Sequence, residues 1–234
     1  MFSFIIPYHN DAHRLQKTLH YLQEKADSYQ ITQIVLCHNG PNFSQDDIPF
    51  LDGVLGKGVE VYTTGVQGVG AGYKLGLQYA KDKYVIFSDS DFPFGFSDLD
   101  SFLQYEKNGL PDYAIGSKAH PDSQIYNRSS KRTIATIGFY LLRVLLLGHQ
   151  TPKDSQGSII VRTDLARTLV EKSNFDNYLF KIELATLALQ TGIKVCEIPI
   201  VFHAAKGEPS SVSVFGDGFK MALGLFQLRR KVQQ

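Results

Sequence analysis

Residues 65–92 read GVQGVGAGYKLGLQYAKDKYVIFSDSDF, a glycine-rich run and a helix-like segment followed by an apolar strand that ends in acid. The strand, expected over residues 84–88, leads into Asp89 and Asp91, two carboxylates one residue apart. In extended backbone, side chains at positions i and i+2 point to the same side, so these carboxylates would converge. Like charges avoid such proximity unless a cation lies between them. The stretch is therefore either a polar turn or a cation site.

Strand-like and helix-like segments alternate along the whole chain. Short runs rich in branched residues predict strands, and longer stretches with helical periodicity predict helices. Strands are expected at 2–7, 31–37, 59–64, 84–88, 113–117, 157–162 and 194–202, and helices at 12–25, within 65–81, and at 98–107, 131–147, 179–191 and 214–231. This alternation predicts a single α/β domain over residues 1–234, with a mostly parallel central sheet flanked by helices. Ligands of such sheets gather beyond the carboxyl ends of the strands, where the two acids lie.

The composition is that of an ordinary soluble globular protein, with 43% apolar and 20% charged residues. The 24 Lys and Arg residues nearly balance the 23 Asp and Glu residues, so no nucleic-acid partner is expected. Cys37 and Cys196 lie in apolar runs and are expected to be buried free thiols. The N-terminal residues predict a first strand rather than a signal peptide. The apolar segment 134–148 is too short to span a membrane, which favours a cytoplasmic location.

The glycine run does not match either of the common nucleotide-binding fingerprints. Gly68 and Gly70 are followed by Tyr73 where the dinucleotide fingerprint requires a third glycine, and the Gly-Lys-Ser/Thr ending of a P-loop is absent. Two explanations remain open. The backbone amides at the start of the helix could form an anion seat, or the small residues could allow the helix to pack closely against the sheet.

Six segments, taken in order, resemble the family 2 glycosyltransferases, and most closely the dolichyl-phosphate mannose/glucose synthase branch, whose members act on polyprenyl phosphates. The resemblance runs from residue 2 to about residue 202. Its segments are FIIPYHNDAHRLQKTLHYL (4–22), the stretch 65–92, AIGSK (114–118), RSSKRTIATIGFYLLRVLLLG (128–148), KDSQGSIIVR (153–162) and YLFKIELATLALQTGIKVCEIPIVF (178–202).

The resemblance implies a GT-A fold with a nucleotide-sugar-binding half (2–118) and an acceptor-binding half (119–234). It implies an inverting hexosyltransferase that depends on Mg²⁺ or Mn²⁺ and moves a sugar from a UDP- or GDP-linked donor to a polyprenyl phosphate. Because the acceptor oxygen of a polyprenyl phosphate is already anionic, no general base would be needed. A peripheral contact with the cytoplasmic face of the membrane would accompany a lipid acceptor.

The resemblance also implies roles for individual residues. The nucleotide site would be formed by Pro7, Tyr8, Asp11, Asn39, Gly68 and Asp89. Asp89 and Asp91 would bind the metal. The candidate catalytic residues are Asp91, Asp154 and Arg132. The phosphate of the acceptor would be held by basic groups, for which the candidates are Lys118, Arg128, Lys131, Arg132 and Lys206.

The chain departs from the family pattern at three places. His38 and Asn39 stand where the family usually carries two acids, so Asn39 can hydrogen-bond a base or ribose but brings no charge. Pro93 replaces a polar residue able to bind metal. Asp154 lies one residue closer to Gly157 than the family pattern has it, and is either an acceptor-side acid or part of a turn.

Two alternative functions remain open, and so does the location of the apolar helix at 134–148. The acceptor could be a soluble glycan, with Asp154 as general base. The chain could instead be a non-catalytic nucleotide-binding module, which the departures favour and the intact acidic pair disfavours. The apolar helix at 134–148 either lies against lipid or packs in the core.

Overall fold

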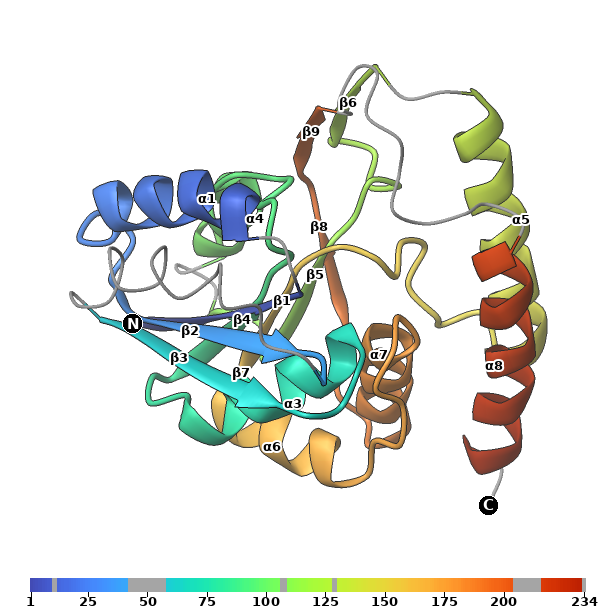
Figure 1. Ribbon diagram of the computed structural model, residues 1–234. Coiled ribbons are helices and arrows are strands. Elements are labelled where there is room, and N and C mark those ends of the chain that lie inside the picture. Colours follow the sequence, from blue (N-terminus) through green and yellow to red (C-terminus); the bar gives the residue numbers. More distant parts are fainter. Residues whose placement is uncertain (10–11, 42–57, 106–108, 128–129, 204–215, 233–234) are drawn as a thin grey trace.

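The computed structural model describes residues 1–9, 12–41, 58–105, 109–127, 130–203 and 216–232 (Figure 1). The strands are β1 (Phe2–Tyr8), β2 (Ile31–Asn39), β3 (Val59–Thr64), β4 (Tyr84–Phe87), β5 (Tyr113–Gly116), β6 (Gln124–Tyr126), β7 (Ile159–Arg162), β8 (Cys196–Ile198) and β9 (Val201–His203). The helices are α1 (Ala12–Lys25), α3 (Val69–Tyr79), α4 (Ser97–Leu103), α5 (Ser130–Leu147), α6 (Thr163–Glu171), α7 (Phe180–Gln190) and α8 (Gly216–Val232). These elements form the α/β domain that the alternating pattern predicts.

The main sheet has the strand order β3-β2-β1-β4-β7-β5-β8. Every neighbouring pair is parallel except those of β7, which runs antiparallel to both β4 and β5. Ile159, the first residue of β7, pairs with Phe87 at the end of β4 and with Ile115 near the end of β5. The segment before β7 therefore lies at the same sheet edge as the segments that follow β4 and β5. The mostly parallel sheet is confirmed, and its one reversed strand brings a third segment to the edge where ligands are expected.

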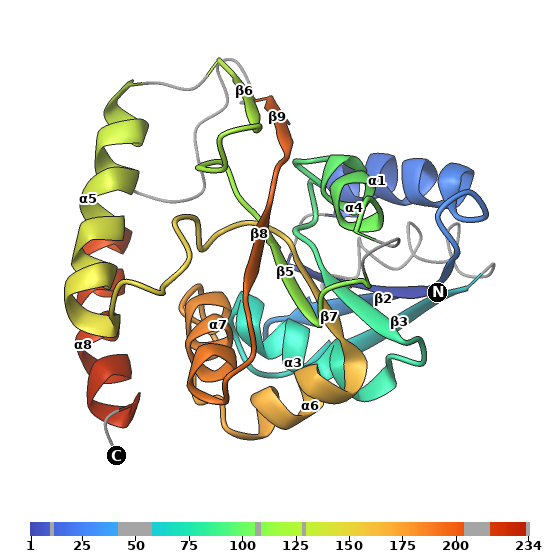
Figure 2. The same cartoon turned by 180° about the vertical axis from the view of Figure 1, so that it is seen from behind.

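Helices cover both faces of the sheet (Figures 1 and 2). On one face, α1 and α4 bury Leu15, Leu19 and Phe102 against the strands. On the other face, α3, α6 and α7 form a second apolar cluster. Helices α5 and α8 pack against each other at one side of the domain, where Leu146, Leu225 and Ile182 of α7 are among the buried residues of a third cluster.

The glycine run serves close packing of α3 against the sheet. A Cβ atom at Gly72 would lie 2.7 Å from the Cβ of Pro7, and one at Gly76 would collide with Ile5. Gly68 precedes α3 with φ of 129°, a conformation that side chains other than glycine rarely adopt. Close helix–sheet approach thus accounts for the small residues, and the nucleotide-binding role of Gly68 stays a prediction.

The expected strand at 194–202 is wrong in its extent. It divides at Pro199, which has no backbone N–H to donate to a strand ladder. β8 continues the main sheet beside β5, whereas β9 pairs with β6 in a separate two-stranded sheet. Neither the three-residue β6 nor α6, which follows β7 directly, was expected from the sequence.

Candidate active site

The acidic stretch forms a turn at the carboxyl end of β4. β4 ends at Phe87, and the backbone N–H of Phe92 donates to the carbonyl of Asp89 at 3.1 Å. Phe92 has φ of 43°, so the chain reverses there. The expectation that Asp89 and Asp91 continue the strand's alternation is therefore wrong. Burial, followed by the negative charges of Asp89 and Asp91, raises the pKa of the Tyr73 hydroxyl well above its ordinary value.

Two buried side chains donate hydrogen bonds to the carboxylate of Asp89. The hydroxyl of Tyr73 donates to Oδ1 of Asp89 at 2.9 Å, and Nζ of Lys181 lies 3.1 Å from the same oxygen. The side chain of Lys181 is 5% exposed and that of Asp89 is 40% exposed, so the carboxylate lies between a buried ammonium and the solvent. The Lys181 ammonium therefore supplies part of the positive charge that the two neighbouring carboxylates require.

Two helices bring these donors to the end of β4. Tyr73 lies in α3 and Lys181 is the second residue of α7. A Cβ atom at Gly70 would lie 2.8 Å from the Cβ of Phe180, so this glycine allows the start of α3 to approach the start of α7. The ring of Phe180 stacks on that of Tyr73, with ring centroids 5.8 Å apart.

Sequence reasoning missed both donors, although each left a signal. Tyr73 stands at the position that disqualified the dinucleotide fingerprint. Lys181 is one of two charged residues in the largely apolar helix FKIELATLALQ, where a buried ionised side chain must be paired. Glu183, the other charge of that helix, is also buried, and it accepts hydrogen bonds from the backbone N–H groups of Asn174 and Phe175.

The donor set at this turn suits a divalent ion that is held mainly by its substrate. Asp91 is exposed and Asp89 is partly exposed, and carboxylate oxygens suit Mg²⁺ and Mn²⁺. Within the described ranges, no group of three or more His, Cys, Asp or Glu residues could hold a metal ion. A Mg²⁺ ion that keeps water and substrate phosphates as ligands needs only one or two carboxylates. The residues therefore fit such an ion but do not form an all-protein metal centre.

Asp154 and Lys118 form an ion pair at the same sheet edge. Nζ of Lys118 lies 3.0 Å from Oδ2 of Asp154, and the backbone N–H groups of Lys118 and Gln156 also donate to this carboxylate. Burial favours a raised pKa of Asp154, but the Lys118 charge and these hydrogen bonds outweigh it and hold the pKa below its usual range. Asp154 therefore joins the segment before β7 to the segment after β5. Its catalytic role and the phosphate-binding role of Lys118 stay predictions.

Arg143 connects α5 to this edge. Its side chain is 1% exposed, and Nη2 donates to the carbonyl of Lys153 at 2.9 Å. Burial lowers the pKa of Arg143, while the nearby charges of Asp154 and Glu197 favour its ionised form. Its Nε and Nη1 groups have no hydrogen-bond partner in the part of the chain that is described. In the sequence, Arg143 is the one charged residue of the apolar segment 134–148, and this position alone does not indicate a contact with the sheet edge.

The remaining predicted site residues fall into two groups. Pro7 and Tyr8 are buried at the end of β1, and Asn39, 8% exposed, ends β2 with no hydrogen-bond partner for its Oδ1 among the described residues. Asp11, Arg128 and Lys206 lie outside the described residues, and Lys131 and Arg132 lie in the first turn of α5, whose side chains are not described.

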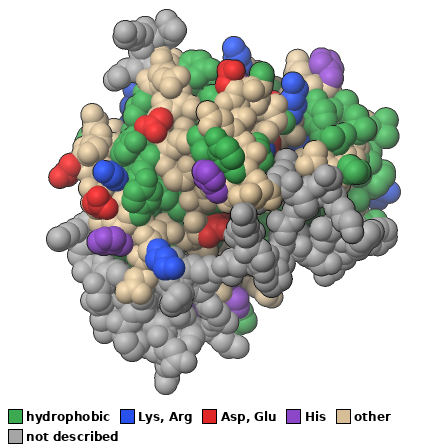
Figure 3. Space-filling model, turned by 90° about the horizontal axis from the view of Figure 1, so that it is seen from above, with side chains coloured by type: hydrophobic (Ala, Val, Ile, Leu, Met, Phe, Trp, Pro, Cys, Tyr) green, Lys and Arg blue, Asp and Glu red, His purple; other side chains and the backbone are tan. Residues whose placement is uncertain are grey.

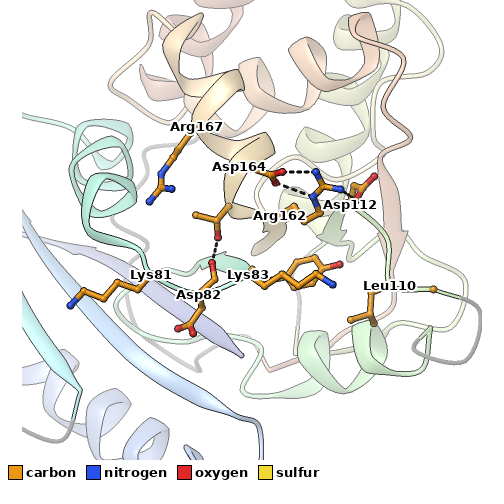
Figure 4. A pocket seen from close by; sticks show the side chains of 11 residues that line it. Lys81, Asp82, Lys83, Leu110, Asp112, Arg162, Asp164 and Arg167 are labelled. Atoms are coloured by element: carbon orange, nitrogen blue, oxygen red, sulfur yellow. Dashed lines mark hydrogen bonds and ion pairs between the residues drawn. The ribbon is translucent and has the colours of Figure 1, made fainter.

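A charged hollow of about 820 Å³ lies at the opposite edge of the sheet (Figure 4). Residues at the start of β4 and at the end of β7 line it. The acidic turn follows the other end of β4. Several of its charges are already engaged, since Arg162 contacts both Asp112 and Asp164, and Arg167 donates to the carbonyl of Ala80. We therefore place the candidate active site at the acidic turn and not in this hollow.

Comparison with known proteins decides the family. The family model described as glycosyl transferase family 2 matches residues 3–170. The chain belongs to this family. The predicted resemblance to family 2 is therefore confirmed.

Two curated relatives of this family 2 chain are dolichyl-phosphate beta-glucosyltransferases. The protein from Saccharomyces cerevisiae is 28% identical over 176 residues, which cover 70% of this chain and 52% of the relative. The Trichomonas vaginalis protein, ALG5D, is 26% identical over 246 residues, which cover 97% of this chain and 72% of the relative. The chain spans about half the length of the yeast relative and of a Drosophila melanogaster relative with the same name.

A solved structure supports the fold of this family 2 member. The crystal structure of Staphylococcus aureus TarS 1-349 in complex with UDP-GlcNAc matches with a TM-score of 0.58 at 16% identity. The match covers 97% of this chain and 66% of TarS 1-349. The expected GT-A fold is confirmed.

The contact between Lys181 and Asp89 makes a testable prediction about stability. We expect Asp89→Ala to lower the free energy of unfolding by about 1–3 kcal/mol, because it leaves the buried Lys181 ammonium without its carboxylate. The exposed Asp91→Ala should change it by less than about 0.5 kcal/mol. Urea unfolding of the single variants and of Asp89→Ala combined with Lys181→Met measures the coupling. If the double variant is as unstable as the sum of the two single variants, the two side chains are not coupled.

Proposed function

We propose that this protein transfers a hexose from a UDP- or GDP-linked donor to a polyprenyl phosphate, with inversion at the anomeric carbon. The observation that carries the proposal is the acidic turn with Asp89 and Asp91 at the carboxyl edge of the sheet in a chain of family 2. This edge is where open α/β sheets bind their ligands. TarS 1-349, which shares the fold, was crystallised in complex with UDP-GlcNAc, and this supports a nucleotide-sugar donor.

In this proposal the acidic turn binds the diphosphate of the donor together with Mg²⁺ or Mn²⁺. Asp91 would hold the ion, because its side chain is exposed. The ion would neutralise negative charge that develops on the leaving diphosphate. Oδ1 of Asp89 accepts from Tyr73 and Lys181, so Asp89 would orient the bound nucleotide from a fixed position.

The polyprenyl phosphate is favoured as the acceptor by the surface of α5. Four side chains spaced by three or four residues lie on one face of this helix and are strongly exposed. They are Ile134 (70%), Ile137 (54%), Leu141 (61%) and Leu145 (74%). Hydrophobic side chains also gather on the right-hand side of the space-filling view, where Figure 1 places α5 (Figure 3). No helix among the described residues is long and apolar enough to cross a membrane.

We therefore propose that α5 lies on the membrane surface, at the cytoplasmic face, and presents the site to a lipid-linked phosphate. A helix with an exposed apolar face and no membrane span is typical of an interfacial contact. Arg143, on the same helix, bonds to the segment that leads into β7, so α5 is joined directly to the sheet edge. The curated relatives are named for dolichyl phosphate, which is a lipid phosphate of this class.

The pairing of Asp154 argues against the soluble-glycan alternative. Such an acceptor would need a general base to remove a hydroxyl proton. The Asp154 carboxylate already accepts from Lys118 and two backbone N–H groups, and its pKa is held low, which makes it a weak base. An anionic phosphate oxygen attacks the anomeric carbon without such a base.

The donor half of the proposal is tested by calorimetry with UDP and GDP. We expect one of the two nucleotides to bind in the presence of Mn²⁺, and Asp91→Ala to weaken this binding at least about tenfold, because a carboxylate ligand of the ion is lost. Gln16→Ala, an exposed change on α1, is the control. If neither nucleotide binds wild-type protein, or if Asp91→Ala binds as tightly as wild type, the site assignment is contradicted.

The acceptor half is tested by sedimentation with vesicles of phosphatidylcholine and phosphatidylserine. We expect Leu141→Glu combined with Leu145→Glu to reduce the bound fraction severalfold, because two charges would enter the interface. Gln16→Glu combined with His20→Glu places the same spacing of acids on exposed positions of α1 and should bind like wild type. Equal binding by both double variants would rule out α5 as the membrane face. Transfer of radiolabelled sugar to a short polyprenyl phosphate in the same vesicles would identify the acceptor directly.

A further inference from the structure

We propose that Lys181 is a resident counter-cation of the donor site, which lets a nucleoside diphosphate bind in part without a metal ion. This inference rests on the proposed function and adds a residue with no assigned role. Lys181 does not contact the solvent-facing side of the site. It acts through Asp89 as a positioning residue and as a fixed positive charge.

Lys181 is buried, so its ammonium group must be stabilised by specific contacts. Transfer of an ammonium group into the interior is costly unless the group is paired. Its side chain is 5% exposed, and its ionic partner is the carboxylate of Asp89, at 3.1 Å. The ring of Tyr73 lies 5.4 Å from Nζ and adds a cation–π contact. Asp89 is much more exposed, so the arrangement places one positive charge directly behind a carboxylate that faces the ligand site.

The pair changes the net charge that a ligand meets. The Lys181 ammonium makes the net charge at the acidic turn one unit less negative than it would be with a neutral side chain at this position. Lys74, which lies in α3 with Tyr73, is paired with Asp176 at 2.8 Å, so these two charges balance each other. A diphosphate therefore meets weaker repulsion than the two acids alone would produce, and a divalent cation meets weaker attraction.

The Lys181 charge is expected to change the affinity for a diphosphate and the affinity for a divalent cation in opposite directions. A general loss of structure would lower both affinities. Removal of the Lys181 charge should tighten the binding of Mn²⁺ alone and weaken the binding of a nucleoside diphosphate in the absence of metal. A variant that merely disturbed the site would lose affinity for both ligands. One elementary charge at this range corresponds to a change of about fivefold to tenfold in each dissociation constant.

The experiment compares wild type, Lys181→Met, Lys181→Gln and Lys181→Arg. Lys181→Gln removes the charge but keeps a donor for Asp89, and Lys181→Arg keeps the charge. Electron paramagnetic resonance measures the binding of Mn²⁺ alone, and calorimetry with EDTA measures the binding of UDP and GDP. The control is Lys81→Met, which breaks the exposed ion pair between Lys81 and Glu60 beyond the other edge of the sheet. Circular dichroism checks that each variant is folded.

We expect wild type to bind one nucleotide weakly in EDTA. Lys181→Met and Lys181→Gln should bind it about fivefold to tenfold more weakly and bind Mn²⁺ more tightly by a similar factor. Lys181→Arg and Lys81→Met should behave like wild type. The inference is overturned if Mn²⁺ affinity is unchanged or falls in the neutral variants, or if nucleotide binding in EDTA is unaffected. If wild type binds neither nucleotide under any condition, the proposed function fails, and the Mn²⁺ measurement alone still decides the role of Lys181.

Discussion

The ion pair between the buried Lys181 and the partly exposed Asp89 is the contact on which the candidate site depends. It joins three parts of the fold, because Asp89 follows β4, Tyr73 comes from α3 and Lys181 from α7. An acidic turn at the end of a strand would otherwise be free to move and would repel a diphosphate. With two buried donors behind it, one carboxylate is fixed and its charge is compensated. The exposed carboxylate of Asp91 can then meet an ion that arrives with its substrate.

The topology of the sheet extends this arrangement toward the acceptor side. β7 runs opposite to its neighbours, so the segment before it lies beside the ends of β4 and β5. Asp154 in that segment pairs with Lys118 after β5, and Lys153 accepts a hydrogen bond from Arg143 of α5. A continuous set of polar contacts thus leads from the sheet edge to the helix whose apolar face is exposed. In the proposed function, the donor and a polyprenyl phosphate would meet along this edge, and the charged acceptor oxygen would need no protein base.

The sequence predicted the fold better than the site. Periodicity located most of the strands and helices, but it could not show that Pro199 divides a strand or that β7 runs backwards, because strand direction is set by tertiary packing. The motif pointed to Asp89 and Asp91 at the end of β4, but it assumed extended backbone, whereas they lie in a turn. Tyr73 and Lys181 were missed because they are 16 and 92 positions away from Asp89 in the chain, and no local pattern reports such a contact. The charge of Lys181 within an apolar helix was the available signal.

The central claim is that the acidic turn, and not the charged hollow at the other edge of the sheet, binds the nucleotide with its metal. Paramagnetic broadening of backbone amide signals by Mn²⁺, recorded by NMR in the presence of UDP or GDP, locates the ion on the molecule most directly. The account predicts that broadening is strongest at residues 88–92 and extends to Tyr73 and Lys181. Broadening centred on residues 81–84 and 162–164, which border the hollow, would contradict it.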